Sequence, residues 1–256
     1  MKTILLTGGN GYIATSILHC LSNDYNIASI CRRDFDLLDS DKVKEWFTDK
    51  YFDVIIHTAV EGGNRLKHET GITAYNNLLM YDNLIDCKDH FQKLITFGSG
   101  AELSAPKSPY GLSKRIINES IVRHNNFYNI RVFAVFDENE NDRRFIKSNI
   151  VRYLKKQPIT IYENKKMDFF YMQDLISIVR SYIDRDDLPK SIDCSYDKHL
   201  SLLDIANLIN GLGEHHVDIV NMENHANDYI GTPCDLNDLI GIERGIKITF
   251  NQILER

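Results

Sequence analysis

The sequence predicts an α/β fold, a doubly wound parallel sheet followed by a small C-terminal lobe. Two observations support this prediction. Short apolar stretches of strand length alternate with helical stretches through the first half of the 256-residue chain, a pattern typical of a parallel sheet with helices on both faces. The first apolar stretch, Ile4-Leu5-Leu6, also runs directly into a glycine-rich turn, as it does in Rossmann-type dinucleotide-binding units.

The remaining elements follow from the same alternation and from local start signals, such as Pro109 at the first position of a helix. The expected strands cover residues 2–7, 26–31, 53–57, 93–97, 130–136, 159–162 and 168–171, with a shorter one near Phe35–Leu38. The expected helices cover residues 11–22, 40–49, 74–89, the segment beginning at Pro109, 143–156, 174–183 and 200–212. We expect a dinucleotide-binding domain over 1–140, to which 160–195 return, and a small substrate-binding lobe formed by 141–159 and 196–256.

Composition narrows the class of protein. The net charge of −6 and the pI of about 5.8 disfavour nucleic acid as a partner. The apolar stretches are shorter than the roughly 20 residues of a membrane span, so no membrane partner is expected. The five cysteines are odd in number and form no CxxC pair, which favours reduced cytoplasmic thiols and predicts no metal site.

The glycine-rich turn reads Thr7-Gly8-Gly9-Asn10-Gly11-Tyr12-Ile13-Ala14. Gly8 permits the tight turn out of the strand. Gly11 lets the backbone approach a pyrophosphate, whose charge then meets the helix N-terminus. The pattern alone would also fit a plain tight loop, but between a strand and a helix it predicts dinucleotide binding. The cofactor-binding candidates in the turn are Gly8, Asn10, Gly11, Tyr12 and Ile13.

The end of the second strand indicates which dinucleotide binds. An NAD enzyme usually carries an acid about twenty residues after the turn, to hold the ribose hydroxyls. This chain has Cys31 followed by two arginines, and arginine pairs bidentately with a phosphate. NADP(H) is therefore the favoured cofactor. NAD(H) stays possible because acids follow closely, and a solvated loop would also explain the arginines. The candidates here are Arg32, Arg33, Asp36 and Leu37.

A second motif, Tyr110-Gly111-Leu112-Ser113-Lys114, places a phenol and an ammonium at i and i+4 on one helix face. A phenol titrates near pH 10, and a neighbouring ammonium favours its ionised form. Ser99, at the end of the preceding strand, would hydrogen-bond the same substrate oxygen. A lone pair of this kind occurs by chance in many helices. Together with the glycine turn it predicts Ser99, Tyr110 and Lys114 as catalytic residues acting on a carbonyl or carbinol.

These motifs resemble the extended short-chain dehydrogenase/reductase family, the NAD(P)-dependent sugar-nucleotide epimerases, dehydratases and reductases. The resemblance covers about residues 1–185. Besides the turn and the Tyr110/Lys114 pair, its segments are Phe97-Gly98-Ser99-Gly100, the pair Asn77 and Asn83, Arg131-Val132-Phe133-Ala134-Val135, and Asp168-Phe169 with Asp174, which is expected to be structural. Residues 32–39 look most like GDP-L-fucose synthase and dTDP-4-dehydrorhamnose reductase, which use NADPH to reduce a nucleotide-linked 4-keto sugar. Residues 57–63 also resemble the fucose synthase segment.

The resemblance implies further site residues. Those expected on the cofactor are Thr58, Ala59, Val60, Asn77, Phe97, Phe133 and Val135, with Tyr110 and Lys114, whose ammonium would hold the nicotinamide ribose. Those expected on the substrate are Glu61, Ser99, Gly100, Ala101, Tyr110, Arg143 and Arg144. The two arginines could clamp a sugar-nucleotide diphosphate, although a solvated helix face fits them equally well. His57 is expected to be structural.

The implied activity is NADPH-dependent reduction of a nucleotide-linked 4-keto-6-deoxy sugar. Sugar 4,6-dehydratases carry an acid pair directly after the catalytic Ser or Thr, where this chain has Gly100 and Ala101, so dehydration is disfavoured. Ala101 also stands where fucose synthases carry a catalytic cysteine, which argues against epimerisation by that route. An NAD-dependent 4-epimerase and a non-enzymatic dinucleotide-binding sensor are the alternatives. By analogy, the helices over 74–89 and 110–124 would pair across the two-fold axis of a homodimer.

Overall fold

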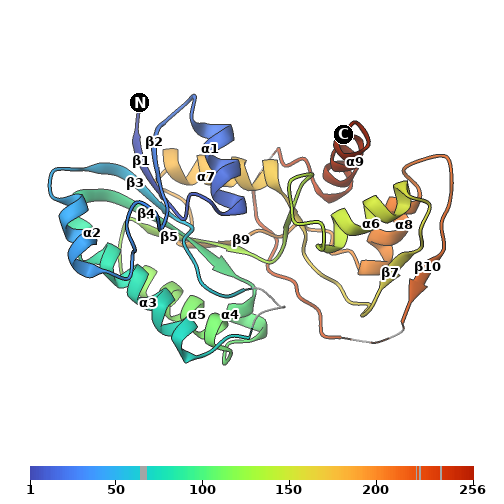
Figure 1. The fold of residues 1–256 in the computed structure, drawn as a ribbon, viewed down its shortest axis with the longest axis horizontal. Coiled ribbons are helices and arrows are strands. Elements are labelled where there is room, and N and C mark those ends of the chain that lie inside the picture. The colour runs from blue at the N-terminus through green and yellow to red at the C-terminus, as the bar shows by residue number, and fades with distance from the viewer. Residues whose placement is uncertain (64–67, 223, 225, 237) are drawn as a thin grey trace. The chain divides into compact units, whose positions relative to one another are not determined.

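A computed structural model describes residues 1–63, 68–222, 224, 226–236 and 238–256. The chain divides into two compact units, coloured along the sequence in Figure 1. Unit 1 comprises Met1–Arg131 and Val179–Ile192, and unit 2 comprises Val132–Ile178 and Asp193–Arg256. The dinucleotide-binding and substrate-binding parts expected from the sequence had other bounds, and their assignment to ligands stays a prediction.

A six-stranded sheet forms the centre of unit 1 and confirms the predicted doubly wound architecture. Its strand order is β2-β1-β3-β4-β5-β9, and β1 pairs in parallel with β2 and β3, as β3 does with β4. Ile4, Leu5 and Leu6 of β1 are fully buried, because helices cover both faces of the sheet and leave no solvated side. The strands are β1 (Thr3–Thr7), β2 (Asn26–Ile30), β3 (Phe52–His57), β4 (Phe91–Ser99), β5 (Phe127–Val132) and β9 (Ser191–Asp193).

The helices of unit 1 lie on the two faces of this sheet (Figure 1). One face carries α2 (Ser40–Phe47), α3 (Gly71–Ile85) and α5 (Pro109–Ile121), and the other carries α1 (Tyr12–Leu21). A one-turn helix, α4 (Ala101–Ser104), joins β4 to α5, and a 3₁₀ turn (Lys88–His90) precedes β4. Side-chain caps fix two of the helix starts: Asp39 accepts from the Lys42 N–H, and Ser108 from the Gly111 N–H.

The short strand expected near Phe35–Leu38 does not form, and this prediction was wrong. Phe35 and Leu37 are buried in the core beside α3, so their alternation reflects burial within a loop. Side chains satisfy this backbone in place of a neighbouring strand. Asp36 accepts from the Leu38 N–H at 3.1 Å, and Asn83 donates to the Leu37 carbonyl at 2.7 Å. The single strand expected over 130–136 is likewise interrupted, with β5 followed by β6 (Val135–Phe136).

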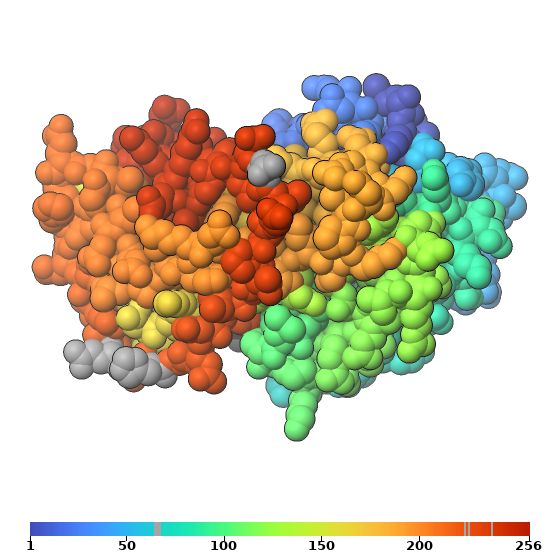
Figure 2. All heavy atoms as spheres, turned by 180° about the vertical axis from the view of Figure 1, so that it is seen from behind, coloured from blue at the N-terminus to red at the C-terminus, as the bar shows by residue number. Residues whose placement is uncertain are grey.

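Residues 179–192 return from unit 2 to complete unit 1. Arg180 pairs with Asp24 at 2.7 Å, and in Figure 2 this orange segment lies beside the blue N-terminal part. Lys93 on β4 is buried, and its ammonium donates to the carbonyls of Tyr182 and Arg185 at 2.8 and 2.7 Å. A lysine from the sheet thus caps the C-terminal end of α7 (Met172–Asp184), where the last carbonyls of a helix favour a cation.

Unit 2 has its own apolar core between three helices and short strands. Two carboxylates anchor its C-terminal segment, which supports their expected structural role. Asp168 accepts from the Gly231 N–H at 2.8 Å, and Asp174 accepts from the Gly241 N–H at 3.0 Å. No helix in the described part of the chain is long and apolar enough to span a membrane. The elements of unit 2 are α6 (Phe145–Leu154), β7 (Ile159–Ile161), β8 (Phe170–Tyr171), α8 (Leu202–Asn210), β10 (Ile219–Asn221) and α9 (Ile242–Leu254), together with β6 and with α7 as far as Ile178.

Candidate active site

The turn after β1 is built as a phosphate-binding turn requires. Gly8 has a φ of +73°, and a Cβ there would lie 2.7 Å from the Ala59 backbone nitrogen, so only glycine fits this crossing. The Gly11 N–H donates to the Gly8 carbonyl at 2.8 Å, and Gly11 is the N-cap of α1. Because Gly11 has no side chain, it leaves the first amide groups of the helix, including those of Tyr12 and Ile13, uncovered for an anion.

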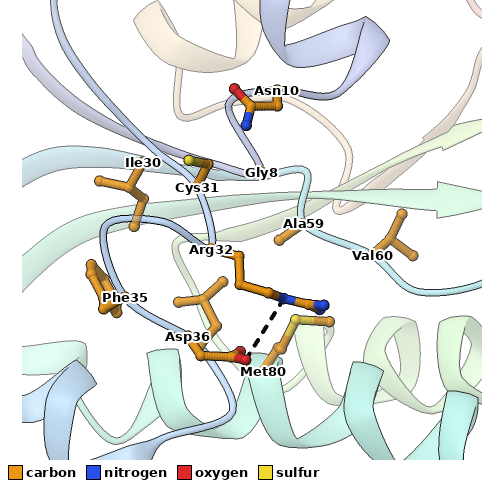
Figure 3. Close-up of a pocket in the computed structure, with 11 residues that line it drawn as sticks. Gly8, Asn10, Ile30, Cys31, Arg32, Phe35, Asp36, Ala59, Val60 and Met80 are labelled. Carbon is orange, nitrogen blue, oxygen red and sulfur yellow. Dashed lines mark ion pairs between the residues drawn. The ribbon is translucent and has the colours of Figure 1, made fainter.

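A cavity of about 290 Å³ opens beside this turn in unit 1. The turn borders it, and apolar side chains from the end of β2, the following loop and α3 form its wall (Figure 3). Several of the predicted cofactor residues meet here, whereas Ile30, Cys31, Phe35 and Met80 were not anticipated. The residues lining the cavity are Gly8, Asn10, Ile30, Cys31, Arg32, Phe35, Asp36, Leu37, Ala59, Val60 and Met80.

Arg32 and Asp36 both line the cavity and form an ion pair there. The Arg32 Nε lies 3.7 Å from an Asp36 carboxylate oxygen, and the Arg32 side chain is 72% exposed. Figure 3 shows this guanidinium between the turn after β1 and Met80 on α3. Arg33 is exposed and is not among the described residues that line the cavity. An apolar wall, an available cation and a helix N-terminus together fit the adenosine and phosphate parts of a dinucleotide.

A second cavity of about 480 Å³ adjoins the first, because Arg32 and Val60 line both. Glu61 lines it as well, and Asn77 holds the Glu61 backbone from both sides. The Glu61 N–H donates to Asn77 Oδ1 at 2.8 Å, and Asn77 Nδ2 donates to the Glu61 carbonyl at 2.9 Å. Asn77 therefore shapes the segment after β3, and a direct contact with cofactor stays a prediction. Thr58 likewise supports the backbone, since its hydroxyl donates to the Thr7 carbonyl at 2.7 Å.

The three predicted catalytic residues lie on neighbouring elements of unit 1. Lys114 on α5 is 7% exposed, and its ammonium donates to the Phe97 carbonyl of β4 at 2.7 Å. The same Nζ lies 5.8 Å from the centre of the Tyr110 ring. Ser99 ends β4, is 7% exposed, and accepts from the Ala101 N–H at 3.2 Å. Burial lowers the pKa of Lys114 to about 8, against the opposing charge of Glu102.

Two glycines let the segment after β3 pass directly over Tyr110. Gly62 and Gly63 have φ values of +88° and +69°. A Cβ on Gly63 would lie 3.2 Å from the Tyr110 hydroxyl, and one on Gly62 would lie 3.3 Å from its ring. A side chain at either position would press on the phenol, so glycine keeps the space beside Tyr110 clear.

His57 has a structural role, as expected. It ends β3, is 4% exposed, and its Nδ1 hydrogen-bonds the Thr7 hydroxyl at 2.8 Å. Burial, helped by the charge of Lys114, lowers the pKa of His57 to about 3. The imidazole is therefore neutral at working pH and links β3 to the turn after β1.

The remaining predicted residues fall in two groups. Gly100 and Ala101 begin α4 in unit 1, directly after Ser99. Phe133, Val135, Arg143 and Arg144 belong to unit 2; their contacts with ligands stay predictions. Phe133 and Val135 are buried there, whereas Arg143 is exposed and Arg144 lies 3.9 Å from Glu140.

The chain matches the NAD dependent epimerase/dehydratase family over residues 4–194. It belongs to this family. It is therefore a nicotinamide-dinucleotide-dependent enzyme of the extended short-chain dehydrogenase/reductase type, as the motifs indicated. No curated protein sequence matches the chain.

Solved structures of this family share the fold. A GDP-mannoheptose C4 reductase from Campylobacter jejuni with NADP bound is 16% identical over 100% of this chain and 98% of its own, with a TM-score of 0.82. A UDP-N-acetylglucosamine 4-epimerase from Methanobrevibacter ruminantium is 17% identical over 99% and 98%, with a TM-score of 0.81. A GDP-L-fucose synthetase from Naegleria fowleri is 18% identical over 99% and 93%, with a TM-score of 0.77. Reductases and epimerases of nucleotide sugars thus both occur among the neighbours.

Proposed function

We propose that the protein is an NADPH-dependent reductase of a nucleotide-linked 4-keto-6-deoxy sugar. One observation carries this choice: the Arg32 side chain lines the cavity beside the dinucleotide turn, where an NAD enzyme usually has an acid. A guanidinium there offers paired donors to a 2′-phosphate. The nucleotide-sugar substrates of the structural neighbours support the substrate class.

The chain's own residues account for the proton chemistry. When bound, the reduced nicotinamide supplies a hydride to the carbonyl carbon of the substrate. The Tyr110 hydroxyl donates its proton to the carbonyl oxygen, and the Ser99 hydroxyl donates a hydrogen bond that orients this oxygen. The Lys114 ammonium, held by the Phe97 carbonyl, favours the phenolate that Tyr110 becomes. Lys114 would also hold the nicotinamide ribose by donating a hydrogen bond to it.

A second function, NAD-dependent 4-epimerisation, has one observation in its favour. Asp36 lines the same cavity as Arg32, and a carboxylate in that wall suits ribose hydroxyls. The same Ser99, Tyr110 and Lys114 would serve that reaction, with the hydride returned to the sugar instead of consumed.

Cofactor titration followed by a substrate panel tests the proposal. The purified protein is titrated with NADPH and with NADH by nicotinamide fluorescence, and nucleotide-linked 4-keto sugars are then added. We expect tighter NADPH binding and one NADPH oxidised per sugar reduced. Tyr110→Phe should lower turnover by about 10²-fold or more and keep NADPH affinity, whereas Tyr75→Phe, at an exposed tyrosine of α3, should change neither. Interconversion of sugar epimers without net consumption of cofactor would favour the epimerase. Unchanged turnover in Tyr110→Phe would contradict the catalytic role.

A further inference from the structure

A buried acid that the motifs do not include lies behind the catalytic serine. Glu102 on α4 is 3% exposed. One carboxylate oxygen accepts from the Ser99 backbone N–H at 2.9 Å, and the other accepts from Arg131 Nε at 3.0 Å. A carboxylate withdrawn from water is stable only when charged and hydrogen-bonded partners surround it. These contacts join α4, the end of β4 and β5.

The backbone around this carboxylate is shaped to admit it. A Cβ on Gly98 would lie 2.4 Å from Glu102 Oε1 and 2.6 Å from Asn129 Nδ2. Asn129 is 1% exposed, and its Nδ2 donates to Asn118 Oδ1 at 3.0 Å. Gly98 therefore leaves the space that the acid fills. The polar groups beneath Ser99 form a packed cluster, not a solvated surface.

The Glu102 carboxylate opposes the positive charge of two cations in this region. These cations are Lys114 on α5, which is 7% exposed, and Arg131 on β5, whose side chain is 12% exposed. In the described part of the chain, the Glu102 carboxylate from α4 acts electrostatically on Lys114, and Lys114 in turn acts on the neutral His57 of β3. Tyr110 lies beside Lys114 on its own helix. Burial lowers the pKa of Lys114, and the Glu102 carboxylate raises it.

We propose that Glu102 is a positioning residue of the Ser99–Tyr110–Lys114 site, where its carboxylate fixes the Ser99 backbone and balances the buried charge of Lys114. The inference rests on the proposed function, in which these three residues act on a carbonyl. Both Glu102 oxygens are engaged with protein groups and the side chain is buried. Glu102 therefore acts through Ser99 and Lys114 and exchanges no proton with the substrate.

The experiment measures the proton affinity of Lys114 directly. Protein with ¹³C-labelled lysine is titrated with base, and the Cε signal that is missing in Lys114→Arg identifies Lys114. Glu102→Gln removes the carboxylate charge while keeping its shape. We expect the proton affinity of Lys114 to fall on the order of tenfold, as expected for loss of a nearby buried unit charge, which places its midpoint about one pH unit lower. Glu102→Asp keeps the charge and should largely keep the midpoint.

Glu119→Gln provides the matched control, because Glu119 is on α5 with a side chain that is 63% exposed. It carries the same charge change and should leave the Lys114 midpoint unchanged. An unchanged midpoint in Glu102→Gln, or an equal shift in Glu119→Gln, would overturn the proposal. If Glu102→Gln does not fold, the double variant with Arg131→Gln removes both charges. It should shift the Lys114 midpoint in the same direction but by less, because loss of the Arg131 cation partly offsets loss of the carboxylate.

The pH dependence of turnover gives a second readout, and the lysine titration predicts the direction in which it should shift. Lys114 acts as an ammonium, so turnover declines as pH rises through its pKa. Glu102→Gln should move this decline to lower pH, and Glu102→Asp should restore it. The lysine titration needs no substrate, so failure to reduce any 4-keto sugar would count against the proposed function alone. If an active Glu102→Gln enzyme lost turnover at the same alkaline pH as the wild type, this would count against the positioning role of Glu102 alone.

Discussion

Replacing Arg32 by alanine tests the assignment of the cofactor most directly. The Arg32 guanidinium lies in the cavity wall, 3.7 Å from the Asp36 carboxylate. If a 2′-phosphate binds there, the guanidinium exchanges this long ion pair for charge-assisted hydrogen bonds to phosphate. NADH lacks that phosphate and would make no such exchange.

The expected magnitude follows from exposure. A hydrogen bond to a charged group contributes about 1.5–3 kcal/mol, and the 72% exposure of Arg32 places this one near the lower limit because water screens the charges. Arg32→Ala should therefore raise the Kd for NADPH about tenfold and that for NADH less than about twofold. Asp36→Asn removes a like charge beside the phosphate and should tighten NADPH binding.

Fluorescence titration of the apo protein with each cofactor provides the assay. Arg33→Ala is the matched control, since it makes the same charge change at an exposed arginine outside the cavity wall. The NADPH effect should shrink as salt is added, because the charges are screened. Equal weakening of NADPH and NADH in Arg32→Ala, or an equal effect from Arg33→Ala, would refute the reasoning.

Three further predictions concern stability. Lys93→Met removes the buried ammonium that binds the carbonyls at the end of α7. In urea titrations it should lower the unfolding free energy by about 3 kcal/mol. The control Lys44→Met removes an exposed ion pair and should change the unfolding free energy by less than about 1 kcal/mol. Gly98→Ala would place a methyl group 2.4 Å from the buried Glu102 Oε1 and should lower both Tm and turnover. In the control Gly71→Ala the new methyl group meets no atom within 4 Å, and Tm should rise or stay unchanged. The pKa of His57 is about 3 in the folded chain and near 6.5 when unfolded, so the unfolded state binds more protons and acid destabilises the fold. Between pH 6.5 and 5 the wild type should lose about 2 kcal/mol more than His57→Asn, and parallel stability curves for the two proteins would contradict this.

Local signals explain why much of unit 1 could be predicted from the sequence. The apolar run of β1 and the glycines after it lie within a dozen residues, and the Tyr110/Lys114 spacing sets their shared helix face whatever surrounds them. The failed strand near Phe35–Leu38 shows the limit of such signals. Phe35 and Leu37 alternate with polar residues as a strand would, yet Asn83 of α3 takes the Leu37 carbonyl, and this partner is distant in sequence.

The same limit explains the residues that sequence reasoning missed. Met80 lines the cavity because α3 packs beside the loop after β2, which no local pattern reveals. For Glu102 the sequence offered one signal. It is an acid three residues after the predicted catalytic Ser99, which Gly98 directly precedes. Its charge partner, Arg131, lies in the segment that contains the predicted cofactor residues Phe133 and Val135, and only the fold brings Glu102 and Arg131 to 3.0 Å.

The scaffold of the candidate site also suggests why one helix carries two buried asparagines. Asn77 holds the backbone of Glu61, and Asn83 holds that of Leu37. Each amide thus replaces the ladder partner that a segment beyond the end of its strand lacks. Because both asparagines lie on α3, a single helix fixes the loop after β2 and the segment after β3 relative to each other. The protein's own hydrogen bonds therefore hold both segments that border the cavity, and such support lowers the ordering cost of binding a dinucleotide.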